Sequence, residues 1–208
     1  MELILVRHGL PVRQEVTQGT ADPDLDPRGH SQARRLAEFL SSEPIDAIYS
    51  SPMARARQTA TPLAEKLGID VVVEPGLAES DRDGTFYAPY EELKASGDPR
   101  WRDGMTAAEW SPDHEPLEEF HERVMSAIDR VIRHHPGQRV VLFCHSGVIC
   151  RYTSTILGHP WDEIGFYYPL YTSVSRVLAS QNGKRTILSL NEIAHLRGTD
   201  LPTGALHG

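Results

Sequence analysis

The residues best suited to chemistry follow two apolar runs. Arg7-His8-Gly9 comes directly after the run at residues 3–6, and His145-Ser146-Gly147 comes directly after the run at 139–144. Arginine and histidine side chains are costly to bury without partners. A cation and an imidazole at the tip of a core strand therefore indicate an anion site that contains a nucleophile. On Arg7-His8-Gly9 alone, a strand end with two ordinary surface side chains explains the pattern equally well.

The elements that must position these residues alternate between strands and helices. Asp26 and Pro27 suit the N-cap and first position of a helix that reaches residue 40. Ser51-Pro52 suits the start of a second helix, which carries Arg55 in its first turn and should bend or break at Pro62. We further expect strands at 45–49, 71–73 and 139–144, a short helix near 90–95, helices over 117–135 and 148–157, and a hairpin of 173–179 with 186–190 around Asn182-Gly183.

This alternation predicts an α/β fold, a three-layer α/β/α sandwich around a mostly parallel central sheet. In such sheets ligands bind beyond the C-terminal ends of the strands. If the strands at 3–6 and 139–144 are parallel neighbours, His8 and His145 emerge at one edge. Arg55 would join them there, together with the free N–H groups at the start of its helix. Such a site binds phosphate, and a histidine in it can transfer a phosphoryl group through a phosphohistidine.

Several segments, taken in order, resemble motifs of the histidine phosphatase superfamily, the phosphoglycerate-mutase-like proteins. They are residues 5–9; Gly19, Asp22, Leu25, Gly29 and Gln32-Ala33; Ser50-Ser51-Pro52 with Arg55-Ala56 and Gln58-Thr59-Ala60; Leu77 with Glu79; Phe120 and Arg123; and His145-Ser146-Gly147. The resemblance covers most of the chain and implies a phosphoglycerate-mutase-like fold.

The resemblance also implies a role for each residue of the pocket. His8 would be the nucleophile, and Arg7, Arg55 and His145 would neutralise the phosphoryl oxygens. Ser146 is expected among the phosphate-binding residues, and His145 counts as catalytic as well as phosphate-binding. No metal or other cofactor is implied, because the arginines supply the positive charge.

The proton donor is implied less directly. Glu79 would protonate the leaving alcohol and then deprotonate the water that hydrolyses the phosphohistidine. In the family a glycine usually follows this acid four residues on, whereas here Gly84 comes five residues after Glu79. Asp81 and Asp83 therefore remain alternative donors.

Two departures from the family pattern bear on the reaction. Leu10-Pro11 stands where the family often has an acidic residue or glutamine followed by threonine or serine, and residues 80–116 form an irregular insertion. We interpret the insertion as a lid or specificity segment. The prediction is a phosphomonoesterase that hydrolyses a small phosphorylated metabolite. The alternatives are phosphoglycerate mutase-type transfer and a non-catalytic member that only binds phosphorylated ligands.

Composition limits the remaining possibilities. The 208 residues fit one domain, 1–208, and a net charge of −8 argues against binding to nucleic acid or anionic membranes. Two cysteines, no visible signal peptide and no long apolar run predict a cytoplasmic protein. The frequency of dimers among soluble enzymes is the only ground for considering a homodimer.

Two rival sites fit the sequence poorly. Tyrosine-phosphatase-type loops separate their cysteine and arginine by five residues, whereas six separate Cys144 from Arg151, so both cysteines are expected in the core. His8 and His145 could share a metal ion, but the neighbouring arginines would repel it.

Overall fold

The central sheet lies between two helical layers, because its middle strands are apolar on both faces. The computed structural model describes residues 1–101, 114–160 and 167–205. Its main sheet has the strand order β4-β3-β6-β1-β7-β8. The bounds are β1 (Glu2–Arg7), β3 (Ala47–Ser50), β4 (Val71–Val73), β6 (Arg139–Cys144), β7 (Val174–Ala179) and β8 (Arg185–Glu192). The pairs β4–β3, β3–β6 and β6–β1 are parallel, and the pairs β1–β7 and β7–β8 are antiparallel.

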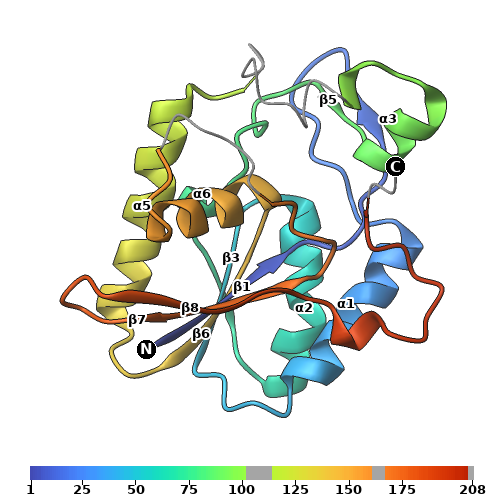
Figure 1. Ribbon diagram of the computed structural model, residues 1–208. Coiled ribbons are helices and arrows are strands. Elements are labelled where there is room, and N and C mark those ends of the chain that lie inside the picture. Colours follow the sequence, from blue (N-terminus) through green and yellow to red (C-terminus); the bar gives the residue numbers. More distant parts are fainter. Residues whose placement is uncertain (102–113, 161–166, 206–208) are drawn as a thin grey trace.

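Side chains of β1 alternate between two cores. Leu3 and Leu5 pack with helices α5 (Leu117–His134) and α6 (Ser146–Ile156), whereas Ile4 and Val6 pack with α1 (Pro27–Leu40) and α2 (Ala54–Leu67). Figure 1 shows the two helix pairs on opposite faces of the sheet. The predicted three-layer sandwich with a mostly parallel sheet is therefore confirmed.

Local sequence signals predict the start of α1 correctly but not the start of α2. Asp26 caps α1 as expected, and its carboxylate accepts the Arg28 N–H at 2.8 Å. The predicted start of α2 is wrong, because the helix begins at Ala54 with Met53 as its N-cap residue, and it continues through Pro62 without a break.

The expectation of free N–H groups at the start of α2 is wrong for the first of them. The carboxylate of Asp22, in the loop before α1, accepts the Ala54 N–H at 2.9 and 3.0 Å, and Ser51 Oγ accepts the Met53 N–H at 3.3 Å. A side chain distant in the sequence thus caps this helix, which explains why the local pattern misplaced its start.

The segment after β4 contains only short elements. These are η1 (Pro75–Leu77), β5 (Phe86–Tyr87), which pairs antiparallel with β2 (Gln14–Glu15), and the expected short helix α3 (Tyr90–Ser96). In Figure 1, β5 and α3 lie together at one end of the molecule. Residues 102–113 of the predicted insertion lie outside the described residues. The predicted C-terminal hairpin is confirmed as β7 and β8, and η2 (Ala194–Leu196) follows it.

Leu36 tests the core between α1 and the sheet. Its side chain is fully buried in the cluster formed by α1, α2 and the sheet, so Leu36→Ala should lower the free energy of unfolding by about 2–5 kcal/mol. Exposed Arg35 on the same helix is the matched control, and Arg35→Ala should change it by less than about 0.5 kcal/mol. Urea unfolding followed by circular dichroism measures both values. Equal values for the two variants would contradict this packing.

Candidate active site

The pairing of β1 with β6 brings the two predicted histidines together. Arg7 lies opposite Cys144 in the parallel ladder, and the His8 N–H donates to the Cys144 carbonyl at 3.0 Å. The rings of His8 and His145 follow at the same edge of the sheet, with their centroids 5.2 Å apart. Both side chains are buried. The prediction that the histidines meet at one sheet edge is confirmed.

The tautomer of His8 follows from its hydrogen bond. Its Nδ1 lies 2.7 Å from the Gly9 carbonyl oxygen, which can only accept, so Nδ1 carries the hydrogen. In the neutral ring Nε2 then keeps its lone pair. Burial and the positive charges of Arg55 and Arg7 hold the pKa of His8 well below its usual value. The ring is therefore neutral near pH 7, with Nε2 available as a nucleophile.

The predicted arginines lie beside His8 and are almost completely buried. Arg7 Nη1 donates to the Pro169 carbonyl at 2.7 Å, and its guanidinium carbon lies 4.2 Å from the Tyr171 ring centroid. Arg55 Nη2 donates to Asp81 at 3.2 Å, and its guanidinium carbon lies 4.7 Å from the Tyr87 ring centroid. These contacts support each cation while leaving part of its hydrogen-bonding capacity unused.

Several buried nitrogens around His8 have no hydrogen-bond partner among the described residues. They are Arg7 Nε, Arg55 Nε, Arg55 Nη1 and His145 Nδ1. Buried polar groups are nearly always hydrogen-bonded, so such a group of nitrogens requires an explanation. An oxyanion with several acceptor oxygens would satisfy them and offset the two positive charges.

Ser51, which the sequence indicates only as part of a family motif, holds His145 in place. The Nε2 of His145 lies 2.8 Å from Ser51 Oγ, which already accepts the Met53 N–H. The Ser51 hydroxyl is therefore best placed to donate to Nε2, which leaves the hydrogen of a neutral His145 on Nδ1. Burial, together with the charge of Arg55, holds the pKa of His145 well below its usual value.

Glu79 lies at the N-terminus of α6. Its Oε2 accepts the Gly147 N–H at 2.8 Å, and its Oε1 accepts the Ser80 N–H at 3.0 Å. A side chain at Gly147 would not fit, because its Cβ would lie 2.3 Å from Glu79 Oε1. Burial and the negative charge of Asp81 raise the pKa of Glu79, against the two N–H donors that lower it. A raised pKa suits a carboxyl group that must give and take a proton.

The two alternative acids have different surroundings. Asp81 forms the ion pair with Arg55 described above, and Asp83 is largely exposed and pairs with Arg82 at 3.3 Å. Arg123, another motif residue, holds the segment that leads to Glu79, because its Nη1 donates to the carbonyls of Gly76 and Ala78 at 2.9 and 3.0 Å. Of the three acids, Glu79 is the one whose carboxylate accepts hydrogen bonds from backbone N–H groups among the described residues.

The loop after His8 is held by two further side chains. The Gly9 N–H donates to Thr59 Oγ1 at 3.0 Å, and the Leu10 N–H donates to Gln32 Oε1 at 2.7 Å. Gln32 Nε2 in turn donates to the Pro202 carbonyl. Thr59 and Gln32 belong to the motif stretches, but the sequence does not show that their role is to position this loop. Ser146 begins α6 directly after His145 and is partly buried.

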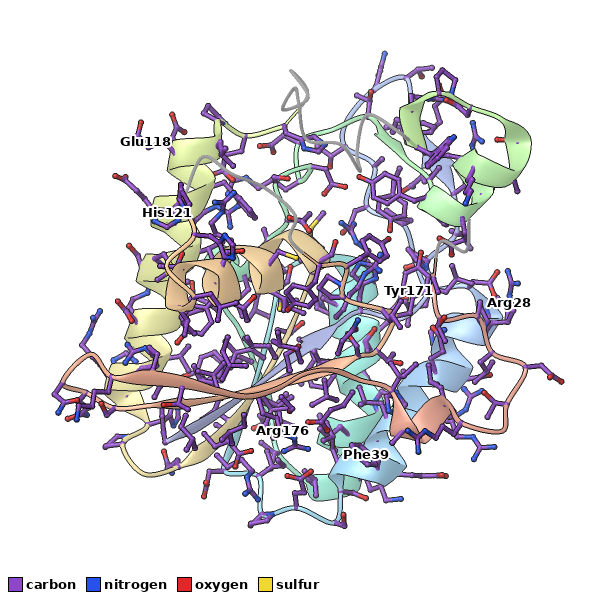
Figure 2. The ribbon with its side chains drawn as sticks, in the orientation of Figure 1. Arg28, Phe39, Glu118, His121, Tyr171 and Arg176 are labelled. Carbon is purple, nitrogen blue, oxygen red and sulfur yellow. The ribbon has the colours of Figure 1, made fainter. Side chains whose placement is uncertain are left out.

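Tyr168 and Tyr171 belong to the site, although the sequence analysis did not predict them there. Tyr168 and Tyr171 stack on Arg7, and Figure 2 labels Tyr171 within the region where the loops meet. The recurrence of tyrosine at residues 167, 168 and 171 was an available signal. It could not be interpreted without knowing that this segment passes beside β1.

The cysteines do not form a rival site. Cys144 is fully buried in the core, and burial raises the pKa of its thiol. Cys150 is only partly buried, and burial raises its pKa to about 12. Neither thiol ionises appreciably near pH 7, and ionisation is what a cysteine nucleophile requires.

The described residues lack two further kinds of feature. They contain no group of three or more histidine, cysteine, aspartate or glutamate residues that could hold a metal ion. They also contain no helix long and apolar enough to cross a membrane.

The two histidines should make the protein acid-sensitive. Because the pKa values of His8 and His145 are lowered on folding, the unfolded chain takes up their protons below about pH 6.5 while the folded chain does not. The free energy of unfolding should fall by up to about 1.4 kcal/mol per pH unit for each histidine. The measurement is urea unfolding between pH 7.5 and 5.5, with NMR titration of the ring protons. Titration of both rings near pH 6.5 would contradict the structure.

Comparison with known proteins agrees with this geometry. The pattern of the histidine phosphatase superfamily (branch 1) matches residues 3–193. Phosphoserine phosphatase 1 of Hydrogenobacter thermophilus is 31% identical over 94% of both chains. Phosphoglycerate mutase-like protein 4 of Arabidopsis thaliana is 32% identical over 71% of this chain and 67% of its own.

Solved structures show the same fold. Phosphoserine phosphatase from Entamoeba histolytica, solved with 3-phosphoglyceric acid, has a TM-score of 0.70 at 21% identity, covering 94% of this chain and 98% of its own. Mycobacterial glucosyl-3-phosphoglycerate phosphatase has a TM-score of 0.72 at 22% identity, covering 93% of this chain and 99% of its own. With its family pattern matched over nearly the whole length, the chain belongs to the histidine phosphatase superfamily.

Proposed function

We propose that the protein is a phosphomonoesterase that hydrolyses a small phosphorylated metabolite through a phosphohistidine at His8. The observation that carries this proposal is the state of His8. Its Nδ1 is hydrogen-bonded to the Gly9 carbonyl and its pKa is lowered. Beside it lie buried arginine nitrogens that have no hydrogen-bond partner among the described residues. The names of several relatives, which include phosphoserine phosphatases, support the substrate class.

In the first step, His8 Nε2 attacks phosphorus, and the bond from phosphorus to the leaving oxygen breaks. Arg7 and Arg55 neutralise the charge that moves onto the non-bridging oxygens. Neutral His145 donates its Nδ1–H to one of these oxygens, and Ser146 is a further phosphate-binding residue. Protonated Glu79 donates its proton to the leaving oxygen, so that a neutral alcohol departs.

In the second step, Glu79 takes a proton from water as the water oxygen attacks phosphorus. The bond between phosphorus and Nε2 breaks, and His8 returns to its neutral state while inorganic phosphate leaves. Glu79 ends this step protonated, as it began the first. The roles of acid and base need a carboxyl group whose pKa lies closer to neutrality than usual, which the raised pKa of Glu79 provides.

We also propose that the chain forms one domain, 1–208, and that residues 80–116 determine its substrate specificity. Of this segment, Tyr87 contacts Arg55 and Tyr90 lies beside Tyr168, with ring centroids 6.3 Å apart. The segment therefore reaches the residues around the phosphate site, as a specificity segment must.

The phosphohistidine is the first test. With p-nitrophenyl phosphate near pH 6, wild type should release phosphate and His8→Ala should lose at least about 10³-fold in kcat, because the nucleophile is gone. Acid quenching during turnover should trap an acid-labile phosphoryl group on wild type only.

Each alternative predicts its own result in this assay. Binding of phosphate without turnover, equal in wild type and His8→Ala, would favour a non-catalytic member. Transfer to a phosphoglycerate acceptor in preference to water would favour a mutase.

The proton donor is tested by varying the leaving group. Glu79→Gln should lower kcat by about 10²–10⁴-fold on an alkyl phosphate, whose alkoxide leaves poorly, and far less on p-nitrophenyl phosphate. Asp83→Asn is the matched control and should change neither value, because Asp83 is largely exposed. If Asp81→Asn shows the leaving-group dependence and Glu79→Gln does not, Asp81 is the donor.

A further inference from the structure

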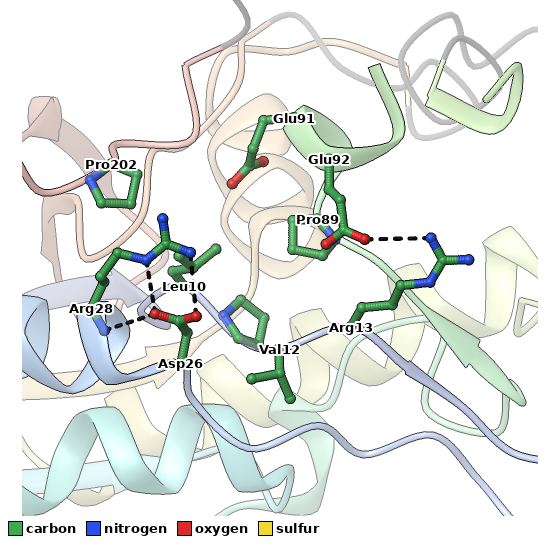
Figure 3. Close-up of a pocket in the computed structure, with 10 residues that line it drawn as sticks. Leu10, Val12, Arg13, Asp26, Arg28, Pro89, Glu91, Glu92 and Pro202 are labelled. Carbon is green, nitrogen blue, oxygen red and sulfur yellow. Dashed lines mark hydrogen bonds and ion pairs between the residues drawn. The ribbon is translucent and has the colours of Figure 1, made fainter. Parts of the chain in front are cut away.

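A pocket of about 350 Å³ lies next to the loop that follows His8. Leu10 and Pro11, the residues that depart from the family pattern, lie in its wall. Figure 3 shows Glu91 of α3 opposite them, with Pro89 and Pro202 on either side. The departure from the family pattern and the α3 segment therefore meet at one surface, where they could bind the part of a substrate that extends away from phosphorus.

The charges in this pocket do not balance. Arg28 is paired with Asp26, with Nε 2.9 Å from Oδ1, and Arg13 is paired with Glu92 at 3.4 Å. These two ion pairs are marked in Figure 3. Glu91 has no ion pair among the described residues. The wall therefore holds one more carboxylate than it has arginines.

The hydrogen bonding of Glu91 is also incomplete. Its Oε2 accepts the hydroxyl of Tyr171 at 3.3 Å, whereas its Oε1 is buried without a hydrogen-bond partner among the described residues. A buried carboxylate oxygen in this state calls for a donor. The Tyr171 ring centroid lies 6.1 Å from that of His8, so one tyrosine separates Glu91 from the nucleophile.

We propose that Glu91 binds an ammonium group on the leaving-alcohol part of the substrate, so that the substrates are compact phosphorylated amino alcohols or amino acids. This inference rests on the proposed phosphomonoesterase function. An ammonium group supplies both a hydrogen-bond donor for Oε1 and the missing positive charge, whereas a hydroxyl supplies only the donor. A divalent cation would need more oxygen ligands than one carboxylate provides.

Two pairs of esters that differ only in this group test the proposal. O-phosphoserine is compared with 3-phosphoglycerate, and phosphoethanolamine with 2-hydroxyethyl phosphate, since each pair exchanges an ammonium for a hydroxyl. In both pairs wild type should favour the ammonium ester by at least about tenfold in kcat/KM, because the analogue leaves the buried carboxylate charge unpaired. Only the esters of the first pair carry a carboxylate. The same preference in both pairs would therefore show that the enzyme recognises the ammonium group and not the carboxylate.

The variant is Glu91→Gln, which keeps an acceptor for Tyr171 and removes the charge. The ratio of kcat/KM for ammonium over hydroxyl ester should fall at least about tenfold, mainly through KM. Glu118→Gln makes the same change on the outer side of α5, where Figure 2 labels Glu118, and should keep the wild-type ratio. Wild type without a preference, or a Glu91→Gln variant that loses both esters equally, would overturn the proposal.

If the proposed phosphomonoesterase function is wrong, the assays give a different result. In that case wild type hydrolyses none of the four esters and no p-nitrophenyl phosphate. Titration calorimetry of phosphoethanolamine and 2-hydroxyethyl phosphate into wild type then decides the matter. Tighter binding of phosphoethanolamine supports the ammonium site, and equal binding rejects it. The wild-type comparison stands even if Glu91→Gln does not fold.

Discussion

The parallel register between β1 and β6 is the constraint on which the site depends. Because Arg7 lies opposite Cys144, each strand ends at the same level and the next residue on each is a histidine. Side chains alternate along a strand, so a slip of one residue would turn either strand's apolar set to the wrong core. The same packing that stabilises the sandwich therefore fixes the position of His8 relative to His145.

The site holds two buried guanidinium groups with incomplete compensation. Asp81 neutralises part of the charge of Arg55, and aromatic rings rather than carboxylates flank Arg7. Such an arrangement is costly to fold, because cations leave water without full partners. For the proposed phosphoryl transfer the same arrangement is an advantage, since a preorganised positive site needs no rearrangement as charge develops on a phosphoryl group. Burial and these two positive charges together lower the pKa of His8 and keep its ring neutral, as its proposed role requires.

Local signals in the sequence were enough for the sandwich, for the cap of α1, and for the meeting of His8 with His145. They failed where the partner is distant. Asp22 caps α2 from another loop, so the helix starts later than Ser51-Pro52 indicates. Tyr171 is in the same situation, since its contacts with Arg7 and Glu91 depend on where the segment before β7 runs. Side chains that act through tertiary contacts leave no periodic pattern, and only a family motif indicates that they matter.

Gln32 connects the loop after His8 to a residue far along the chain. It accepts from the Leu10 N–H and donates to the Pro202 carbonyl, while the Tyr171 N–H donates to the Thr203 carbonyl at 2.9 Å. On the ribosome, Thr203 is made nearly two hundred residues after Leu10. The nascent chain can form β1 and α1 early, but it cannot complete the wall of the site until this late segment has emerged. A partly translated protein that lacks this segment therefore lacks a finished pocket, because Pro202 lies in the pocket wall.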